Sequence, residues 1–165
     1  MAGFVIEFKR SNSCPDANHP HWIDLGLPSG TQWACCNTGA SKPEDYGNYY
    51  TFEQAQAYNP PSLGKIEELL DNTISEWTTQ NGVNGRRFTG LNGCTLFLPA
   101  AGQKNDESFN GGLENVGTKG YYWSSEYMIE PDMAYYLYFS SKQVGSHYNL
   151  GFEERSVRPV RKNGN

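Results

Sequence analysis

The histidines are the first residues to test for chemistry, because histidine binds metals and transfers protons near neutral pH. His19 and His21 lie two residues apart in a Pro-rich stretch, and His147 lies in a polar stretch near the C-terminus. Two histidines at this spacing can hold a metal ion, but the sequence marks no third ligand. We therefore predict no metal site and no cofactor.

The four cysteines are Cys14, Cys35, Cys36 and Cys94. They include no CxxC pair and no histidine at the spacing of zinc ligands. Cys35 and Cys36 are adjacent, so in a strand their side chains would point to opposite faces. One of them could then be buried while the other meets Cys14 or Cys94. A disulfide is one alternative in an oxidising compartment, and the sequence leaves the pairing open.

The sequence lacks the catalytic and phosphate-binding motifs considered next. It has no GxSxG elbow, and Gly111-Gly112 precedes no GK[ST] of a phosphate-binding loop. A pair of carboxylates, Glu153/Glu154, is expected in a C-terminal loop, where it is solvated or contacts a ligand. No residue set suits a reacting centre, so we predict that the protein is not an enzyme.

The motif Glu130-Pro131-Asp132 can present two carboxylates to calcium and to sugar hydroxyls. C-type lectins use a motif of this shape, together with a Trp-Asn-Asp further along the chain. No such partner follows here, so the motif alone predicts no calcium site.

Composition favours a loop-rich binding domain. The 165 residues carry a net charge of −5, which argues against nucleic acid as a partner. Aromatic residues make up 14%, with 11 Tyr, and tyrosine suits recognition surfaces as well as strands. No stretch predicts a membrane span or a signal peptide. We expect an extracellular or cell-surface protein whose signal was removed, or a phage virion protein.

The elements that must position these residues begin with a hairpin. Its arms are predicted over Trp22–Leu27 and Thr31–Cys36, around a Pro28-Ser29-Gly30 turn, with Trp33 in the core. Alternating apolar residues predict an edge strand at Phe4–Phe8. The predicted organisation is an N-terminal extension over 1–20, one domain over 21–161 and a tail over 162–165.

Two helices are predicted next. Glu53–Tyr58 is a short helix that ends before Asn59-Pro60-Pro61. Leu63–Asp71 repeats apolar residues at three- and four-residue spacing, with Ser62 as its N-cap and Asn72 as its stop.

The rest is predicted as strands and loops. Two Asn-Gly pairs within Thr73–Gly90 predict a hairpin whose loop is longer than two residues. The other predicted elements are a strand at Cys94–Pro99, a loop at Gln103–Lys119, and final strands at Tyr121–Ser125, Ala134–Ser140 and Ser156–Val160, with a polar loop before the last.

Several segments, in order, resemble a known family. They are IDLGLPSGTQWACCNTGA (23–40), PEDYGNYYTF (43–52), PSLGKIEELLDN (61–72), EWTTQNGVNGRRFTGLNG (76–93), LFLPAAG (96–102), GYYWSS (120–125) and SVRPVR (156–161). Over about Trp22–Arg161 the chain resembles the major paralogous domain of the Fibrobacter and Bacteroides type. That domain is similar to the variable proteins of diversity-generating retroelements. The resemblance implies a C-type-lectin-like fold, which is α+β with antiparallel strands, one or two short helices and long loops.

The resemblance also implies a surface ligand-binding module, whose ligand is a protein or a glycan on a cell or phage surface. In the diversified relatives the variable residues lie between the YYWSS and SVRPVR runs. The matching positions are Glu126, Met128, Ile129, Glu130, Asp132, Met133, Tyr136, Tyr138, Ser140, Lys142, His147, Tyr148, Leu150, Glu153 and Glu154.

Two alternative functions follow from the same resemblance. The first is a variable protein of a diversity-generating retroelement on a bacterium or a phage. Diversification acts on adenines, typically in Asn codons ending in C, and such codons cannot become Glu, Met or Lys, which favours a fixed surface. The second is an enzyme of the sulfatase-modifying type, which shares the fold. That enzyme needs a cysteine close to the C-terminal end, and no cysteine follows Cys94.

Overall fold

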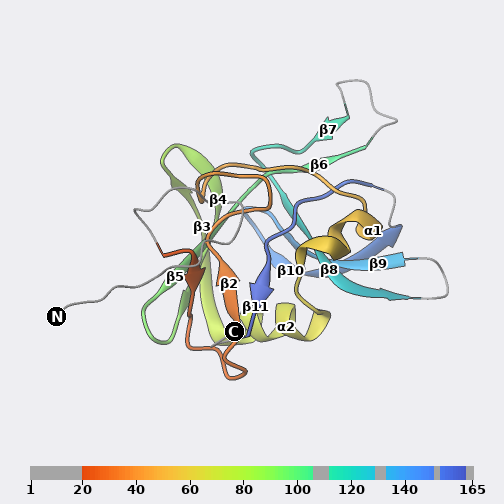
Figure 1. Ribbon diagram of the computed structural model, residues 1–165. Helices are drawn as coiled ribbons and strands as arrows, with labels where there is room; N and C mark the ends of the chain where they lie inside the picture. The colour runs from red at the N-terminus through yellow and green to blue at the C-terminus, as the bar shows by residue number, and fades with distance from the viewer. Residues whose placement is uncertain (1–19, 106–111, 129–132, 151–152, 163–165) are drawn as a thin grey trace.

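The computed structural model describes residues 20–105, 112–128, 133–150 and 153–162. Small antiparallel sheets predominate, with two short α-helices and one 3-10 helix (Figure 1). The predicted α+β class is therefore confirmed. The predicted edge strand at Phe4–Phe8 lies outside the described residues.

The predicted N-terminal hairpin is present, with shorter arms. β1 (Trp22–Ile23) pairs antiparallel with β2 (Gln32–Ala34). The turn closes with a hydrogen bond from the Gly30 N–H to the Leu27 carbonyl, and Gly30 has a φ of +77°, which glycine tolerates. β11 (Val160–Arg161) pairs with the other side of β2, so the first and last described strands share one sheet.

The second arm does not reach Cys36 as predicted. β2 ends at Ala34, and Cys35 and Cys36 lie in a bend. The Arg158 guanidinium explains this end, because it donates to the carbonyls of Ala34 and Cys35 at 3.1 Å each. These carbonyls accept hydrogen bonds from a side chain and not from the backbone of a neighbouring strand.

The last predicted strand, Ser156–Val160, is also corrected. Ser156 forms only an isolated bridge with Tyr122, and β11 begins at Val160. Pro159 has no N–H to offer a neighbouring strand, which limits pairing before Val160.

The first predicted helix is present as two consecutive short helices. α1 (Phe52–Ala55) starts with a capping box, in which the Gln54 N–H donates to Thr51 Oγ1 and the Thr51 N–H donates to Gln54 Oε1. η1 (Gln56–Tyr58) follows and ends at Asn59, whose φ is +54°. Asparagine adopts this left-handed conformation more readily than most residues.

The second predicted helix is confirmed as α2 (Leu63–Asn72). Ser62 caps it, because its Oγ accepts a hydrogen bond from the Lys65 N–H at 3.2 Å. Asn72 is the last helical residue rather than the residue that stops the helix. Its side-chain amide donates to the Glu68 carbonyl at 2.8 Å, which satisfies one carbonyl of the last turn.

The loop of the central hairpin is shorter than predicted. β3 (Thr73–Gln80) and β4 (Val83–Gly90) are joined by Asn81 and Gly82 alone. Both turn residues have positive φ, +51° and +83°, which is the type I′ arrangement that matches strand twist. The second pair lies inside β4, where a Cβ on Gly85 would be 2.3 Å from the Leu98 carbonyl oxygen, so this glycine permits close strand packing.

The strand predicted at Cys94–Pro99 is confirmed as β5 (Thr95–Pro99), which pairs with β4. The stretch predicted as loop from Gln103 to Lys119 is not all loop. It contains β6 (Gln103–Lys104) and β7 (Leu113–Glu114), which pair with each other. Such short polar strands carry little periodicity that a sequence pattern could reveal.

The C-terminal sheet has the strand order β10-β9-β8. β8 (Gly120–Met128) and β9 (Met133–Phe139) confirm two predicted strands, with a register shift between Trp123 and Tyr127. β10 (Val144–Leu150) was predicted as a polar loop, and that prediction was wrong. Its seven residues all pair with β9, so backbone pairing outweighs weak strand propensity.

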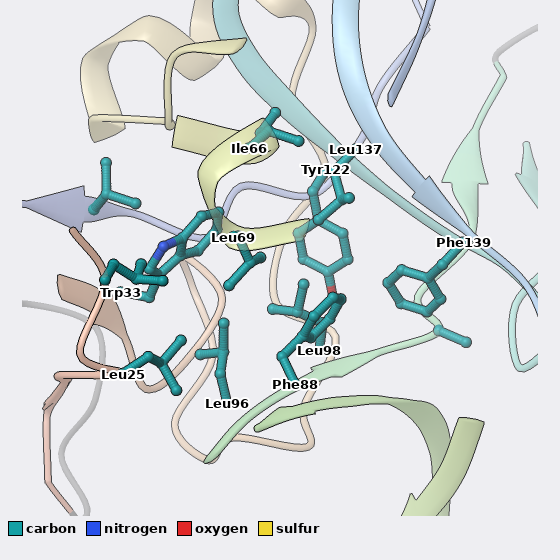
Figure 2. Packing of buried hydrophobic residues seen from close by; sticks show 13 residues of the cluster. Leu25, Trp33, Ile66, Leu69, Phe88, Leu96, Leu98, Tyr122, Leu137 and Phe139 are labelled. Carbon is teal, nitrogen blue, oxygen red and sulfur yellow. The ribbon is translucent and has the colours of Figure 1, made fainter. Parts of the chain in front are cut away.

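The main core lies between α2 and the sheets. Ile66 and Leu69 of α2 are fully buried against residues of β2, β4, β5, β8 and β9. Figure 2 shows these side chains converging, with Trp33 on one side and Phe139 on the other. Trp33 is fully buried, as predicted. Among the described helices, none has the length and apolar character needed to cross a bilayer.

Candidate functional site

One surface of the C-terminal sheet gathers aromatic side chains. We name Tyr121, Trp123, Tyr136, Tyr138 and His147 the aromatic face. The register places Tyr121 opposite Tyr138, and Tyr136 between Trp123 and His147. Because successive side chains of a strand alternate, all five lie on the same side of the sheet. The rings touch, with centroids of Tyr138 and His147 at 5.0 Å and of Tyr121 and Tyr138 at 5.4 Å.

Arg155 lies over the inner part of the aromatic face. Its guanidinium carbon is 4.1 Å from the Tyr136 ring centroid and 4.5 Å from that of Trp123. Its side chain is 1% exposed, and it donates to Glu153 Oε1 at 2.6 Å and to Gln103 Oε1 at 2.9 Å. Cation–π contacts and a charge-assisted hydrogen bond therefore fix the rings and the 153–155 segment against each other.

The electrostatics of this cluster favour neutral phenols and a charged guanidinium at neutral pH. Burial raises the pKa of Tyr136, while the nearby Arg155 charge opposes the rise. Burial likewise raises the pKa of Tyr121 to about 12. Burial lowers the pKa of Arg155, and Tyr136 and Glu153 act in the opposite direction. These phenols are therefore contact surfaces and hydrogen-bond donors rather than bases at pH 7.

The outer part of the aromatic face is accessible. Tyr138 is half-buried and His147 is exposed on β10, the edge strand. The Tyr136 ring stacks with the His147 ring at 6.2 Å between centroids. An incoming molecule would meet two rings with polar tips beside fixed aromatic neighbours, which is the composition typical of recognition surfaces.

Tyr136 was predicted to be exposed to ligand, and the structure corrects this. It is 7% exposed and belongs to a buried cluster with Trp123 and Val157. The C-terminal segment that contains Arg155 covers it, which no local pattern in the sequence indicates. Tyr136 therefore belongs to the covered part of the aromatic face, and Tyr138 is its accessible neighbour on the same side of β9.

The remaining predicted positions do not form one surface. Tyr148 is 53% exposed but lies on the opposite side of the sheet, where its ring contacts Tyr135. Met128 and Met133 pair with each other and are half-buried. These three positions cannot act with His147 on the same small ligand, because the sheet separates their side chains from the aromatic face.

Two further groups sit at the ends of strands. Ser140 and Lys142 form the turn between β9 and β10, and the Lys142 N–H donates to Ser140 Oγ at 3.2 Å. Glu126 is exposed in the irregular part of β8. Ile129, Glu130 and Asp132 lie outside the described residues. The backbone of Leu150 pairs with Met133, and its side chain is not described.

A hollow that the sequence did not predict lies next to Glu154. It has a volume of about 800 Å³ and is lined mainly by Asn48, Tyr50, Gln54, Tyr58, Lys104 and Glu154. The rings of Tyr50 and Tyr58 are 4.8 Å apart. The backbone of Tyr50 pairs with Arg155, so the hollow adjoins the segment that supports the aromatic face.

A sequence signal for this hollow existed. GNYYTF concentrates amide and aromatic side chains in six residues, a composition that suits a recognition surface. Among the described residues, no group of three or more His, Cys, Asp or Glu is arranged to hold a metal ion.

Comparison with known proteins gives one family. Neither a curated protein nor a solved structure matches the chain. A family model described as a domain of unknown function, DUF8237, matches residues 64–160. The matched region runs from α2 to β11, so it contains the aromatic face and Arg155 but not the N-terminal hairpin or Tyr50. Since it spans more than half of the 165 residues, the chain belongs to the DUF8237 family.

Proposed function

We propose that this protein is a non-catalytic binding module that presents its aromatic face to a protein or a glycan at a cell or phage surface. The observation that carries this proposal is that one part of the aromatic face is covered and fixed while the neighbouring part is accessible. Tyr138 and His147 are accessible, while Tyr136 and Trp123 on the same side of the sheet are held in place under the Arg155 guanidinium. Rigid aromatic contacts lose little conformational entropy when they bind, so such a face is suited to recognition.

The carboxylates beside this face would orient a ligand. Glu153 is half-buried and bound to Arg155, and Glu154 lines the adjoining hollow. A binding surface of this kind combines aromatic contact area with a few fixed polar groups. The hollow would extend the contact beyond the face itself.

We also infer a C-type-lectin-like fold, with the resemblance to the Fibrobacter and Bacteroides paralogous domain as its basis. Two features of the molecule support this inference. The segment between GYYWSS and SVRPVR forms strands with exposed side chains, and α+β architecture with long connections surrounds it. A variable protein of a diversity-generating retroelement is the second candidate, favoured by the exposed side chains of His147 and Asn149 on the edge strand β10, which can change without altering the core.

A matched pair of variants tests the proposed function. The full chain and its variants would be applied to one array of purified extracellular proteins and defined oligosaccharides. We expect Tyr138→Ala with His147→Ala to weaken capture on the order of 30-fold, the effect of losing an interface hot spot. Tyr148→Ala removes a similar ring from the opposite side of the same sheet and should leave capture unchanged.

Circular dichroism and the urea midpoint would confirm that both variants remain folded. Loss of capture in Tyr148→Ala, with capture retained by the double variant, would move the binding surface to the other side of the sheet. Capture that is insensitive to both variants would reject the sheet as the binding surface.

A further inference from the structure

The hollow next to Glu154 has walls from three segments that backbone hydrogen bonds hold in place. The backbones of Lys104 and Glu154 exchange two hydrogen bonds, at 2.8 and 2.9 Å. The backbones of Tyr50 and Arg155 are joined in the same way. The third wall is α1 with η1, whose start is fixed by the capping box at Thr51. Walls held in this way are preorganised, so a ligand would lose little free energy in ordering them.

Two tyrosine rings form the aromatic part of this hollow. The ring centroids of Tyr50 and Tyr58 are 4.8 Å apart, and the ring planes are inclined at 38°. Tyr58 is 39% exposed, so part of this residue is open to an incoming molecule. The face of an aromatic ring is electron-rich and attracts C–H groups that carry a partial positive charge. One face of a pyranose ring presents several such C–H groups, so a sugar can stack on Tyr58.

The polar groups of the hollow combine hydrogen-bond donors with acceptors. Asn48 and Gln54 supply side-chain amides, Lys104 an ammonium group and Glu154 a carboxylate. Lys104 and Glu154 are directly opposed in an antiparallel pair, so their side chains leave the backbone on the same side. A sugar hydroxyl both donates and accepts hydrogen bonds, and it can therefore bridge an ammonium and a carboxylate.

The lining disfavours both an acidic ligand and an apolar protein anchor. Arg155, the other cation of this segment, is 1% exposed and donates to Glu153 and Gln103. Glu154 would repel a negative group placed beside it. Among the described residues that line the hollow, Ala57 has the only purely aliphatic side chain, so little aliphatic surface is offered to a protein partner. An uncharged ligand rich in hydroxyl groups matches this lining better.

We propose that this hollow is a subsite for one uncharged hexopyranose unit of a glycan. Tyr58 contacts the C–H face of the sugar ring, while Lys104, Glu154 and the two amides bind its hydroxyl groups. The volume of about 800 Å³ accommodates a sugar ring with bridging water molecules. The inference rests on the proposed binding function and narrows its ligand to a glycan, whose sugar is selected in the hollow and not on the aromatic face.

Saturation-transfer NMR of the full chain tests the subsite. The probes are the methyl glycosides of glucose, galactose, mannose and N-acetylglucosamine, with N-acetylneuraminic acid as the charged comparison. We expect at least one methyl glycoside to bind, with transfer strongest at its ring C–H protons. Binding of none of the four, or stronger binding of the charged sugar, would overturn the proposal.

Matched variants locate the sugar. Tyr58→Ala should weaken binding of the glycoside on the order of 10-fold, whereas Tyr58→Phe keeps the ring and should cost less than about 3-fold. Tyr148→Ala removes an exposed ring elsewhere and should have no effect. Tyr138→Ala with His147→Ala should also leave glycoside binding unchanged, although it weakens capture of the complete ligand. An effect of Tyr148→Ala equal to that of Tyr58→Ala would reject the hollow as the subsite.

Ionic strength separates an uncharged ligand from an acidic one. Attraction between exposed charges weakens as salt rises, because the screening length falls from about 10 Å at 0.1 M to about 3 Å at 1 M. Binding of the glycoside should therefore be equal in dilute and in molar sodium chloride. A steep loss of binding with salt would contradict recognition of a neutral sugar.

Tyrosine nitration provides a measurement that does not depend on the folding of any variant. Tetranitromethane, which nitrates accessible tyrosines, would be applied to the natural protein with and without the bound glycoside, and peptides would be analysed by mass spectrometry. The proposal expects the sugar to protect Tyr58 and to leave Tyr138 and Tyr148 equally nitrated. Protection of Tyr138 alone would place the sugar on the aromatic face, which overturns the subsite and retains the proposed function. Protection of Tyr148 alone, or of no tyrosine, would overturn the subsite as well.

Discussion

Arg158 connects more of the molecule than any other single side chain described above. It is fully buried and donates to Asn37 Oδ1 at 2.8 Å, to the Phe97 carbonyl at 3.0 Å, and to the carbonyls of Ala34 and Cys35. These acceptors belong to the N-terminal hairpin, the connection after it, and β5. One planar cation thus joins three regions that are distant in sequence.

Arg158→Lys should therefore destabilise the fold even though it keeps the charge. A single ammonium cannot reach all the acceptors spread around the edge of the guanidinium plane, so two or more buried acceptors would lose their donors. We expect a loss of about 3 kcal/mol in the free energy of unfolding, measured by urea denaturation. Arg161→Lys is the control, since Arg161 stacks on Trp22 at the surface and should cost less than about 1 kcal/mol. Equal effects of the two variants would contradict this account.

The sequence showed the types of these residues but not their roles. Arg158 falls within the strand predicted at Ser156–Val160, and nothing local indicated that it is buried or that Arg155 covers Tyr136. Burial of a charged side chain depends on acceptors supplied by distant segments. Trp33 was predicted as the core residue of a hairpin arm, and this is confirmed, since tryptophan is highly buried on average.

The β3–β4 hairpin is the element whose local chemistry decides its geometry most directly. Both Asn81 and Gly82 have positive φ, and no atom lies within 4 Å of a Cβ built on Gly82. Space is therefore not a constraint at Gly82, and only backbone conformation selects glycine.

Gly82→Ala should lower stability by about 1 kcal/mol, because alanine adopts a φ near +80° only with strain. The same substitution at Gly64 in α2 should raise stability by about 0.5–1 kcal/mol, since alanine favours the helix. A Cβ there would meet only Ser62 Oγ, at an ordinary 3.8 Å. Urea midpoints of the two variants should move in opposite directions. A shift of the same sign in both would mean that packing, not backbone conformation, governs these sites.

Elements with a strong local sequence signal were predicted well. Elements that form because a neighbouring strand offers backbone partners were not. α2 has a cap, an apolar stripe and ten residues, so its pattern is complete within its own sequence. β10 has the sequence VGSHYNL, and half-exposed polar residues alternate without a clear apolar face. It is a strand because β9 offers a full row of backbone partners, which no property of residues 144–150 reveals.

At the scale of the whole molecule, tyrosine links the separate sheets. The Tyr122 hydroxyl donates to the Pro99 carbonyl at 2.6 Å, between β8 and β5. The Tyr49 hydroxyl donates to the Ala101 carbonyl at 2.7 Å. Tyrosine richness was expected to suit recognition surfaces as well as strands, and the structure shows that Tyr122 joins two sheets while Tyr49 joins two connecting segments. The sequence alone does not indicate which tyrosines lie on a recognition surface and which join separate segments of the fold.

This use of tyrosine predicts sensitivity to alkali. Burial raises the pKa of Tyr49 and Tyr121 to about 12, and raises that of Tyr122 further. In the unfolded chain a phenol ionises near pH 10, so above that pH the unfolded state releases protons that the folded state retains. The contribution of these phenols to the free energy of unfolding should be constant below pH 10 and fall as the pH rises above 10. The fully buried Tyr122 contributes up to about 1.4 kcal/mol per pH unit in that range, and the partly solvated Tyr49 and Tyr121 contribute less.

Urea denaturation at pH 8 to 11.5, with tyrosinate absorbance as a second signal, measures this loss. Tyr122→Phe should be less stable than the natural protein at pH 8, because it loses the hydrogen bond to Pro99. Its stability should nevertheless fall less steeply above pH 10, because one buried phenol has been removed. The difference between the two curves therefore narrows as the pH rises, which loss of packing alone would not produce. Parallel curves would show that ionisation of the buried tyrosines does not control alkaline unfolding.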